Sequence, residues 1–286
     1  MNKKPPWLKK KFYPFDSVTG IENTLRAKGI NTVCQEAGCP NLGECFHNGT
    51  ATFLILGNTC TRNCRFCAVA KGTPAPLDIS EPKNIAQTIL DMELKYCVIT
   101  SVTRDDLPDG GATHFIKIIQ EIRKISTDIK IEVLIPDFGG NHAPLCSILD
   151  WSPDVLGHNI ETVPRLYSKV RPMADYSVSL SVLKRAKEKN PAIFTKSSLM
   201  LGMGETRDDV ICSMKDLREV GCDLLTIGQY LQPSHKQLPV TRYIPPEEFE
   251  MFREIGQEMG FRTVTSGPFV RSSFKAELVF NQICNQ

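Results

Sequence analysis

Three cysteines are the residues of this chain whose type and spacing point most clearly to chemistry. Cys60, Cys64 and Cys67 stand at C-x3-C-x2-C spacing, and their thiolates are soft ligands that suit zinc or an iron–sulfur cluster. A structural zinc site needs a fourth ligand nearby, but this loop offers no histidine and no fourth cysteine. A [4Fe–4S] cluster held by three thiolates keeps one iron open. The spacing therefore favours such a cluster, with zinc as the alternative.

A second cysteine triplet precedes the first along the chain. It has C-x4-C-x5-C spacing and consists of Cys34, Cys39 and Cys45. Gly38 and Gly43 stand between these cysteines, and we expect them to ease the tight backbone turns that wrap a cluster. A small zinc loop with His47 as its fourth ligand is the alternative. The two triplets together predict two metal centres.

The elements that position these cysteines follow a repeating order. After residue 50, short β-rich runs alternate with amphipathic segments, as in consecutive βα units with a parallel sheet. The predicted strands are Thr52–Leu56, Tyr96–Thr100, Lys130–Ile135, Val155–Asn159, Ile193–Leu201, Leu224–Tyr230 and Arg262–Thr265, and the predicted helices are Pro82–Leu94, His114–Ile125, Glu205–Val220 and Pro246–Met259. We therefore predict an α/β fold: a partial parallel βα barrel over residues 51–266, with extensions at 1–50 and 267–286. Chemistry in such barrels lies on the loops that follow the strands, which is where Cys60 falls.

Composition and charge exclude several other classes of protein. The content of 41% hydrophobic and 23% charged residues is ordinary for a globular protein. A net charge of +2 is too small to imply a nucleic-acid partner, although a basic tail that could steer an acidic partner protein contains Lys3, Lys4, Lys9, Lys10 and Lys11. No apolar stretch approaches the ~20 residues of a membrane helix, and the N-terminus lacks the apolar centre of a signal peptide. Eleven cysteines, an odd number in a long chain, argue against a disulfide framework. We expect a cytoplasmic protein.

The first triplet, with the aromatic Phe66 just before its last cysteine, resembles the signature of the radical S-adenosylmethionine (SAM) superfamily. The resemblance implies that the open iron binds the amino and carboxylate groups of SAM and delivers an electron to its sulfonium. Cleavage yields methionine and a 5′-deoxyadenosyl radical, chemistry that the cofactor carries while the protein orients it. In this superfamily the residue at the position of Phe66 lies near the adenine.

The two triplets in this order resemble the lipoyl synthase family, from about Asn31 to Ala276. Its other characteristic stretches are Cys97–Gly111, Ile131–Asp137, Met200–Thr206, Gly228–Pro233 and Ser266–Ser273. The resemblance implies a sulfurtransferase that inserts two sulfur atoms, at C6 and C8, into an octanoyl group on a lysine of a carrier protein. Each insertion would consume one SAM, and an auxiliary [4Fe–4S] cluster would donate the sulfur. The implied partners are the glycine-cleavage H protein or an oxo-acid dehydrogenase acyltransferase subunit, a flavodoxin or ferredoxin, and an iron–sulfur carrier.

The resemblance also implies ligands for the auxiliary cluster. These are the thiolates of Cys34, Cys39 and Cys45 and a serine oxygen from the Arg-Ser-Ser motif near the C-terminus. We assign the serine ligand to Ser273, with Ser272 as the alternative. Phe274 departs from the family, in which tyrosine is usual after the serines.

A further set of residues is expected to contact SAM, and no acid or base is expected in catalysis. The set consists of Phe66, Thr100, Ser101, Glu132, Asn159 and Arg171. Asp105 and Asp106, beyond the second predicted strand, are also candidates for the amino group of SAM. Glu132 lies in an apolar run where an unpaired carboxylate would be costly, so a cofactor contact and a structural ion pair are both open.

Two other functions remain open from the sequence. One is a different radical SAM enzyme that inserts sulfur into a free small molecule. The other is a zinc-binding module without catalysis, which anaerobic metal analysis would reveal as two zinc ions without iron or sulfide.

Overall fold

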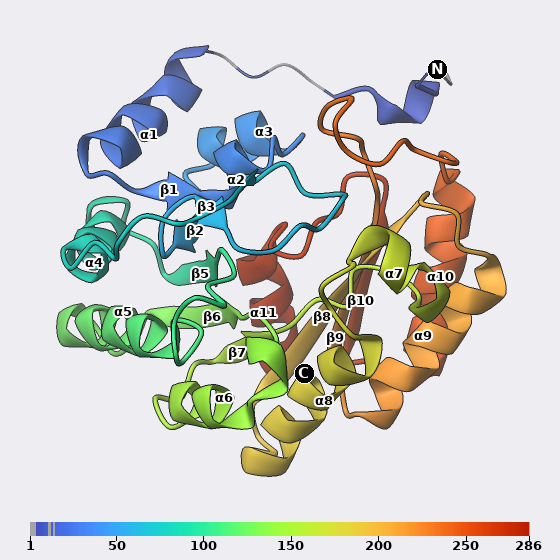
Figure 1. Ribbon diagram of the computed structural model, residues 1–286. Coiled ribbons are helices and arrows are strands. Elements are labelled where there is room, and N and C mark those ends of the chain that lie inside the picture. Colours follow the sequence, from blue (N-terminus) through green and yellow to red (C-terminus); the bar gives the residue numbers. More distant parts are fainter. Residues whose placement is uncertain (1–3, 11–12, 14, 286) are drawn as a thin grey trace. The chain divides into compact units, whose positions relative to one another are not determined.

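The structure is a computed structural model that describes residues 4–10, 13 and 15–285 (Figure 1). The chain divides into two compact units. The N-terminal unit comprises Phe12–Asn63 and Ala68–Leu156, and the C-terminal unit comprises Met1–Lys11, Cys64–Cys67 and Gly157–Gln286. The loop that carries the first triplet therefore passes from one unit to the other after Asn63. The expected division at residues 50 and 266 stays a prediction.

Parallel strands and the helices between them make up the N-terminal unit. Its strands are β1 (Asn31–Thr32), β2 (Thr52–Ile55), β3 (Thr59–Cys60), β4 (Ala70–Lys71), β5 (Tyr96–Ser101), β6 (Lys130–Leu134) and β7 (Val155–Gly157), whose last residue belongs to the other unit. Its helices are α1 (Phe15–Ala27), α2 (Val33–Glu36), α3 (Leu42–His47), α4 (Glu81–Asp91), α5 (Ala112–Ile125), the 3-10 turn η2 (Phe138–Gly140) and α6 (His142–Leu149). Strands β2, β5 and β6 pair in parallel, and β1 pairs antiparallel with β2. Helices α4, α5 and α6 pack in sequence along these strands (Figure 1).

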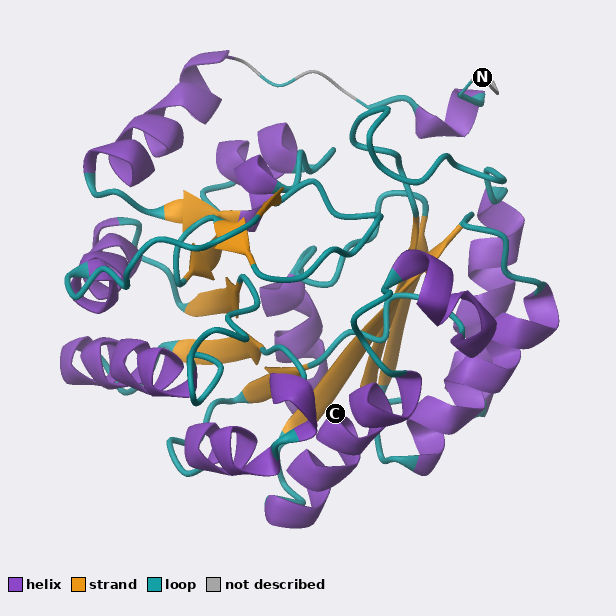
Figure 2. Cartoon of the chain, viewed as in Figure 1, coloured by secondary structure: helices purple, strands orange, loops and turns teal. Residues whose placement is uncertain are grey.

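The C-terminal unit repeats this alternation. Its strands, β8 (Phe194–Leu201), β9 (Leu224–Gln229) and β10 (Thr263–Gly267), pair in parallel in that order (Figure 2). Its helices are η1 (Pro6–Leu8), η3 (Pro164–Leu166), α7 (Tyr167–Val170), α8 (Tyr176–Lys189), α9 (Arg207–Glu219), α10 (Pro246–Glu258) and α11 (Ala276–Cys284). Leu199, Met214, Ile227 and Phe252 belong to its buried core.

The predicted strands and helices are confirmed, with ends that differ by a few residues. Helix α5 shows the reason, because its apolar residues at helical spacing are all buried: Phe115, Ile118, Ile119 and Ile122. The sequence analysis did not predict the helices α1, α2, α3, α6, α7, α8 and α11 or the short strands β1, β3 and β4. Helix α8 was not predicted because its buried face includes Ser179 and Ala186 beside Val182 and Leu183. These two small residues weaken the apolar pattern in the sequence.

Candidate cluster and cofactor site

A glycine turn shapes the start of the second triplet. Gly38 follows α2 with a φ of +59°, in the left-handed region that favours glycine. The N–H of Cys39 donates to the carbonyl of Cys34 at 3.0 Å, and the N–H of Gly38 donates to that of Gln35 at 3.0 Å. This pair of bonds is a Schellman motif, in which the residues at the positions of Cys34 and Cys39 commonly contact each other.

A second motif of the same kind ends α3. The N–H groups of Thr50 and Gly49 donate to the carbonyls of Cys45 at 2.9 Å and Phe46 at 3.1 Å, and Gly49 has a φ of +71°. Gly43 instead lies inside α3. The expectation that Gly43 eases a tight turn is therefore wrong, because the turn comes after the helix, at Gly49.

The thiols of the second triplet interact with one another. Cys34 is buried, and burial raises the pKa of its thiol to about 12, with Cys39 and Cys45 adding to the rise. Hydrogen bonds from Thr52, the first residue of β2, oppose it. Three soft donors from one segment form a set that fits an iron–sulfur cluster. Over the described ranges, no three Cys, His, Asp or Glu side chains are close enough to hold a metal ion as they stand, so the ligands stay predicted.

Backbone N–H groups approach the sulfur of Cys60, the last residue of β3. Those of Arg62 and Thr103 donate to its Sγ at 3.5 and 3.4 Å. The carbonyl of Cys60 accepts from the N–H of Gly72 at 3.1 Å. Hydrogen bonds to the sulfurs that hold a cluster are one of the features that set its reduction potential.

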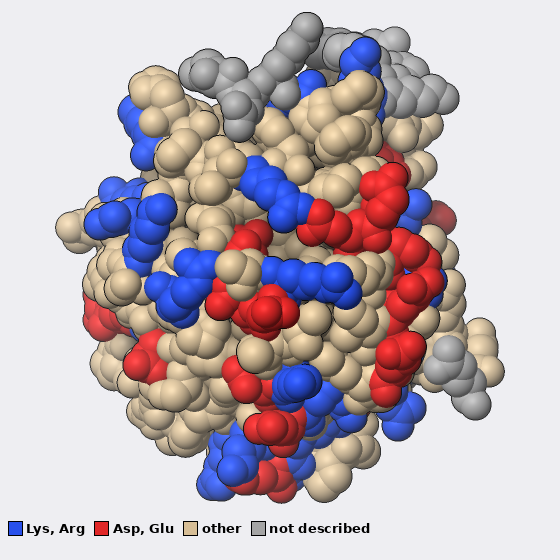
Figure 3. Space-filling model, turned by 90° about the vertical axis from the view of Figure 1, so that its right-hand side faces the viewer, with Lys and Arg blue, Asp and Glu red and all other residues tan. Residues whose placement is uncertain are grey.

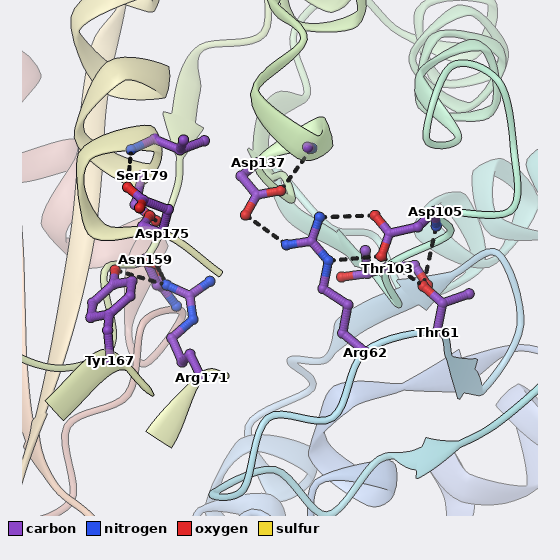
Figure 4. A network of polar contacts seen from close by, with 12 residues as sticks. Thr61, Arg62, Thr103, Asp105, Asp137, Asn159, Tyr167, Arg171, Asp175 and Ser179 are labelled. Carbon is purple, nitrogen blue, oxygen red and sulfur yellow. Dashed lines mark hydrogen bonds and ion pairs between the residues drawn. The ribbon is translucent and has the colours of Figure 1, made fainter. Parts of the chain in front are cut away.

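Arg62 is the buried centre of an ion-pair network in the N-terminal unit (Figure 4). Its Nε and Nη2 each donate to Asp105 at 2.8 Å, and its Nη1 donates to Asp137 at 2.6 Å. Burial by itself lowers the pKa of Arg62, but the bonds to Asp105 and Asp137 outweigh burial and raise it. The sequence analysis missed Arg62, although an arginine between two cluster cysteines was a usable signal.

Cys64 and Cys67 are anchored to loops of the C-terminal unit. The N–H of Cys67 donates to the carbonyl of Cys64 at 3.3 Å. Between them, the N–H of Arg65 donates to the carbonyl of Val170 at 2.9 Å, and its carbonyl accepts from Leu238 at 3.0 Å. The adjoining Phe66 packs against the apolar core of this unit. The segment is thus fixed by the end of α7 and by the loop after β9.

Asn159 and Arg171, both predicted to contact SAM, lie together in the C-terminal unit (Figure 4). The Nη1 of Arg171 donates to the carbonyl of Asn159 at 3.0 Å, and its guanidinium stacks 5.3 Å from the Tyr167 ring centre. The side chain of Asn159 donates to Glu161 and accepts from the hydroxyl of Ser272, each at 3.0 Å. These bonds join the loop after β7 to the C-terminal segment that carries the predicted serine ligand.

Glu161 was missed by the sequence analysis. Its φ of +64° is unusual for a residue with a side chain. Burial raises the pKa of its carboxyl, while the charges of Arg171 and Arg271 and the bond from Asn159 oppose the rise. A carboxylate that is shielded from water needs polar or positively charged partners to offset the cost of burial.

Gly228, in β9, lets the C-terminal segment approach the strand closely. A Cβ at this position would lie 2.0 Å from the carbonyl oxygen of Val270, so only glycine fits. Together with the bond between Ser272 and Asn159, this contact fixes the backbone next to Ser273.

Thr100 and Ser101 are the last two residues of β5, which ends one residue beyond the predicted end. The hydroxyl of Thr100 donates to the carbonyl of Leu134 at 3.0 Å, whereas that of Ser101 is buried without a hydrogen-bond partner among the residues described. Glu132 accepts a 2.6 Å bond from the hydroxyl of Tyr96, a partner that the sequence analysis did not name. Burial and the Glu132 charge raise the pKa of Tyr96. Contacts of Thr100, Ser101 and Glu132 with SAM stay predictions.

Positive and negative side chains are interspersed on the face drawn in Figure 3, with acidic groups continuous along one side. In the basic tail, the ammonium of Lys10 lies over the rings of Phe269 and Phe274, at 5.1 and 5.7 Å. Lys3 and Lys11 lie outside the described residues. No helix in the described part of the chain is long and apolar enough to cross a membrane.

Comparison with known proteins identifies the family. The family model of the radical SAM superfamily matches residues 54–228. A lipoyl synthase from Caldanaerobacter subterraneus subsp. tengcongensis is 54% identical over 276 residues, which cover 96% of each chain. The chain belongs to the lipoyl synthase family. A family member from Histophilus somni is likewise 54% identical, over 96% of this chain and 87% of its own.

Membership of the lipoyl synthase family confirms several predictions. The enzyme class, a radical SAM sulfurtransferase, is confirmed, as are the cofactors, [4Fe–4S] clusters and SAM. Methylornithine synthase has a similar structure, with a TM-score of 0.54 and 14% identity over 91% of this chain and 79% of its own. The maturase HydG gives a TM-score of 0.61 and 14% identity over 79% of this chain and 53% of its own. These likenesses concern the fold alone, and they confirm the partial parallel βα barrel.

Proposed function

We propose that this member of the lipoyl synthase family inserts two sulfur atoms, at C6 and C8, into an octanoyl group bound to a carrier protein. The observation that carries the proposal is the 54% identity to a lipoyl synthase over 96% of the chain. The presence of both cysteine triplets supports it.

Cys60, Cys64 and Cys67 are the proposed ligands of the radical SAM cluster, which supplies the electron that cleaves SAM when it is bound. The backbone N–H groups of Arg62 and Thr103 donate to the sulfur of Cys60. Anchoring of the segment around Phe66 restricts the motion of Cys64 and Cys67. The buried hydroxyl of Ser101 and the pair Asn159 and Arg171 are the proposed polar contacts for SAM, with Thr100, Glu132 and Phe66 in support.

Cys34, Cys39 and Cys45, with Ser273, are the proposed ligands of the auxiliary cluster, from which the inserted sulfur comes. The two glycine turns hold the backbone of the cysteine segment. Ser272 donates to Asn159, and Ser273 is the proposed oxygen ligand on the basis of the family resemblance alone. Neither serine needs to act as an acid or base in this role.

The proposed partners are octanoylated lipoyl carriers, namely the glycine-cleavage H protein and oxo-acid dehydrogenase acyltransferase subunits. A flavodoxin or ferredoxin is the proposed reductant, and an iron–sulfur carrier is proposed to rebuild the auxiliary cluster. The proposed location is the cytoplasm, supported by an odd number of cysteines in a long chain.

Product analysis tests the proposed reaction. The protein, reconstituted anaerobically with iron and sulfide, is incubated with octanoylated H protein, SAM and dithionite, and the carrier is examined by mass spectrometry. Conversion of the octanoyl group to a lipoyl group is expected, with no product on a carrier whose acceptor lysine is replaced by arginine. Formation of 5′-deoxyadenosine without a lipoyl product would contradict the proposal and support a small-molecule substrate. Two bound zinc ions, with no iron and no SAM cleavage, would support the zinc module.

A further inference from the structure

Three loops that follow consecutive parallel strands meet at the guanidinium of Arg62. Arg62 lies just after the short strand β3, in the connection between β2 and α4, whereas Asp105 lies in the loop after β5 and Asp137 in the loop after β6 (Figure 4). Two nitrogens of Arg62 bind the two oxygens of Asp105, and a third binds Asp137. Arginine suits this position because its planar fork binds one carboxylate through two parallel bonds and keeps a further donor for another.

The same network includes the residue that follows Cys60. The N–H and the hydroxyl of Thr61 both donate to the carbonyl of Thr103, at 3.1 and 3.0 Å. The N–H of Asp105 donates back to the hydroxyl of Thr61 at 3.1 Å. Asp105 therefore fixes the cysteine loop twice, through Arg62 and through Thr61.

These contacts have a direct effect at the sulfur of Cys60. The N–H of Arg62 and the N–H of Thr103, one from each of the loops joined by the network, donate to that sulfur. The burial of the charges is costly, since Arg62 is 8% and Asp137 3% exposed. The two N–H donors at the sulfur of Cys60 indicate a role for this network besides stability.

We propose that Arg62, with Asp105 and Asp137, is a positioning group that holds two N–H donors on the sulfur of Cys60 and thereby sets the reduction potential of the cluster bound there. The proposal rests on the proposed cluster at Cys60, Cys64 and Cys67. Hydrogen bonds to cluster sulfurs are one of the factors that set such potentials. Because N–H donors favour the more negative, reduced cluster, their loss lowers the midpoint potential.

The test is Arg62→Lys, which keeps the positive charge but removes the planar guanidinium that binds Asp105 through two bonds. We expect the SAM-responsive electron paramagnetic resonance signal to titrate at a lower midpoint potential, and 5′-deoxyadenosine formation with dithionite to be several-fold slower. The matched control is Arg123→Lys. Arg123 pairs with Asp154 in the same unit and binds the carbonyl of Ile129, just before β6, so its loss tests for general destabilisation.

Equal midpoint potentials and equal rates of SAM cleavage in Arg62→Lys and Arg123→Lys would overturn the proposal. If Arg62→Lys does not fold by circular dichroism, Asp105→Asn serves instead, because Asp105 is 38% exposed and asparagine still accepts one bond. A potential unchanged in Asp105→Asn would equally overturn it. These readouts need no carrier, so failure of lipoyl formation in the unsubstituted protein is distinguished from failure of this proposal.

Discussion

The N–H of Cys39 donates to the carbonyl of Cys34 at 3.0 Å, across the turn made by Gly38. This hydrogen bond joins two backbone groups, so the turn that links Cys34 and Cys39 in the proposed auxiliary site needs no side-chain contact. Such a turn reduces the conformational freedom that cluster binding must remove.

Replacement of Gly38 by alanine should damage this site. A residue with a Cβ in the left-handed conformation costs about 1–2 kcal/mol, so Gly38→Ala should lower the free energy of unfolding and the iron bound per chain. The control is Gly43→Ala, since Gly43 lies in α3 and its new Cβ would meet Tyr13 only at 3.6 Å. Iron contents that are the same in the two variants would argue against a role for the Gly38 turn.

The two triplets should differ in the activities they support. Cys64→Ala should abolish SAM cleavage, whereas Cys34→Ala should keep some cleavage and lose sulfur insertion. Both products, 5′-deoxyadenosine and the lipoyl group, are measured in the same reaction. Equal loss of both in a folded Cys34→Ala protein with an intact radical SAM cluster would contradict this division.

The two adjacent serines should also behave differently. Ser273→Ala should lose the auxiliary cluster and sulfur insertion while SAM cleavage persists. Ser272→Ala removes one hydrogen bond, to Asn159, and should cost about 1 kcal/mol of stability with most sulfur insertion retained. Iron content and the amount of lipoyl product are measured for both variants. If Ser272→Ala loses the auxiliary cluster and Ser273→Ala keeps it, the ligand is Ser272.

Thr206 and Asp209 form a capping box at the start of α9. We expect this capping box to make the free energy of unfolding depend on pH in the acid range. Bonds from Arg165 and from Thr206 lower the pKa of Asp209 from 3.8 to about 2. Because the folded-state pKa is the lower one, this stabilisation is complete above about pH 5 and disappears as the pH falls toward 2. Asp209→Asn should therefore be less stable than the unsubstituted protein at pH 6, with a smaller difference at pH 3.

Thermal unfolding at several pH values measures that difference. Asp208→Asn is the control, because Asp208 also lies in the first turn of α9 but is not part of the capping box. A stability difference for Asp209→Asn that does not change between pH 6 and pH 3 would contradict the assignment.

Local sequence patterns predicted much of the fold and the kind of site. The strands and long helices followed from apolar periodicity, because burial on one or both faces imposes it on the sequence. Both cysteine triplets were visible because metal ligands held by one segment must be closely spaced. Glu132 was predicted to need a polar partner, but Tyr96, 36 residues away in the chain, had no local signal.

The sequence by itself determined the family, the cofactors and the cysteines available to bind clusters. Only the tertiary structure decided which backbone turn follows each helix of the second triplet, so that Gly49 rather than Gly43 turns the chain. It also decided that Arg62 meets Asp105 and Asp137, 43 and 75 residues further on. The physical reason is that spacing along the chain encodes only local geometry, whereas pairing between loops depends on how parallel strands align their ends.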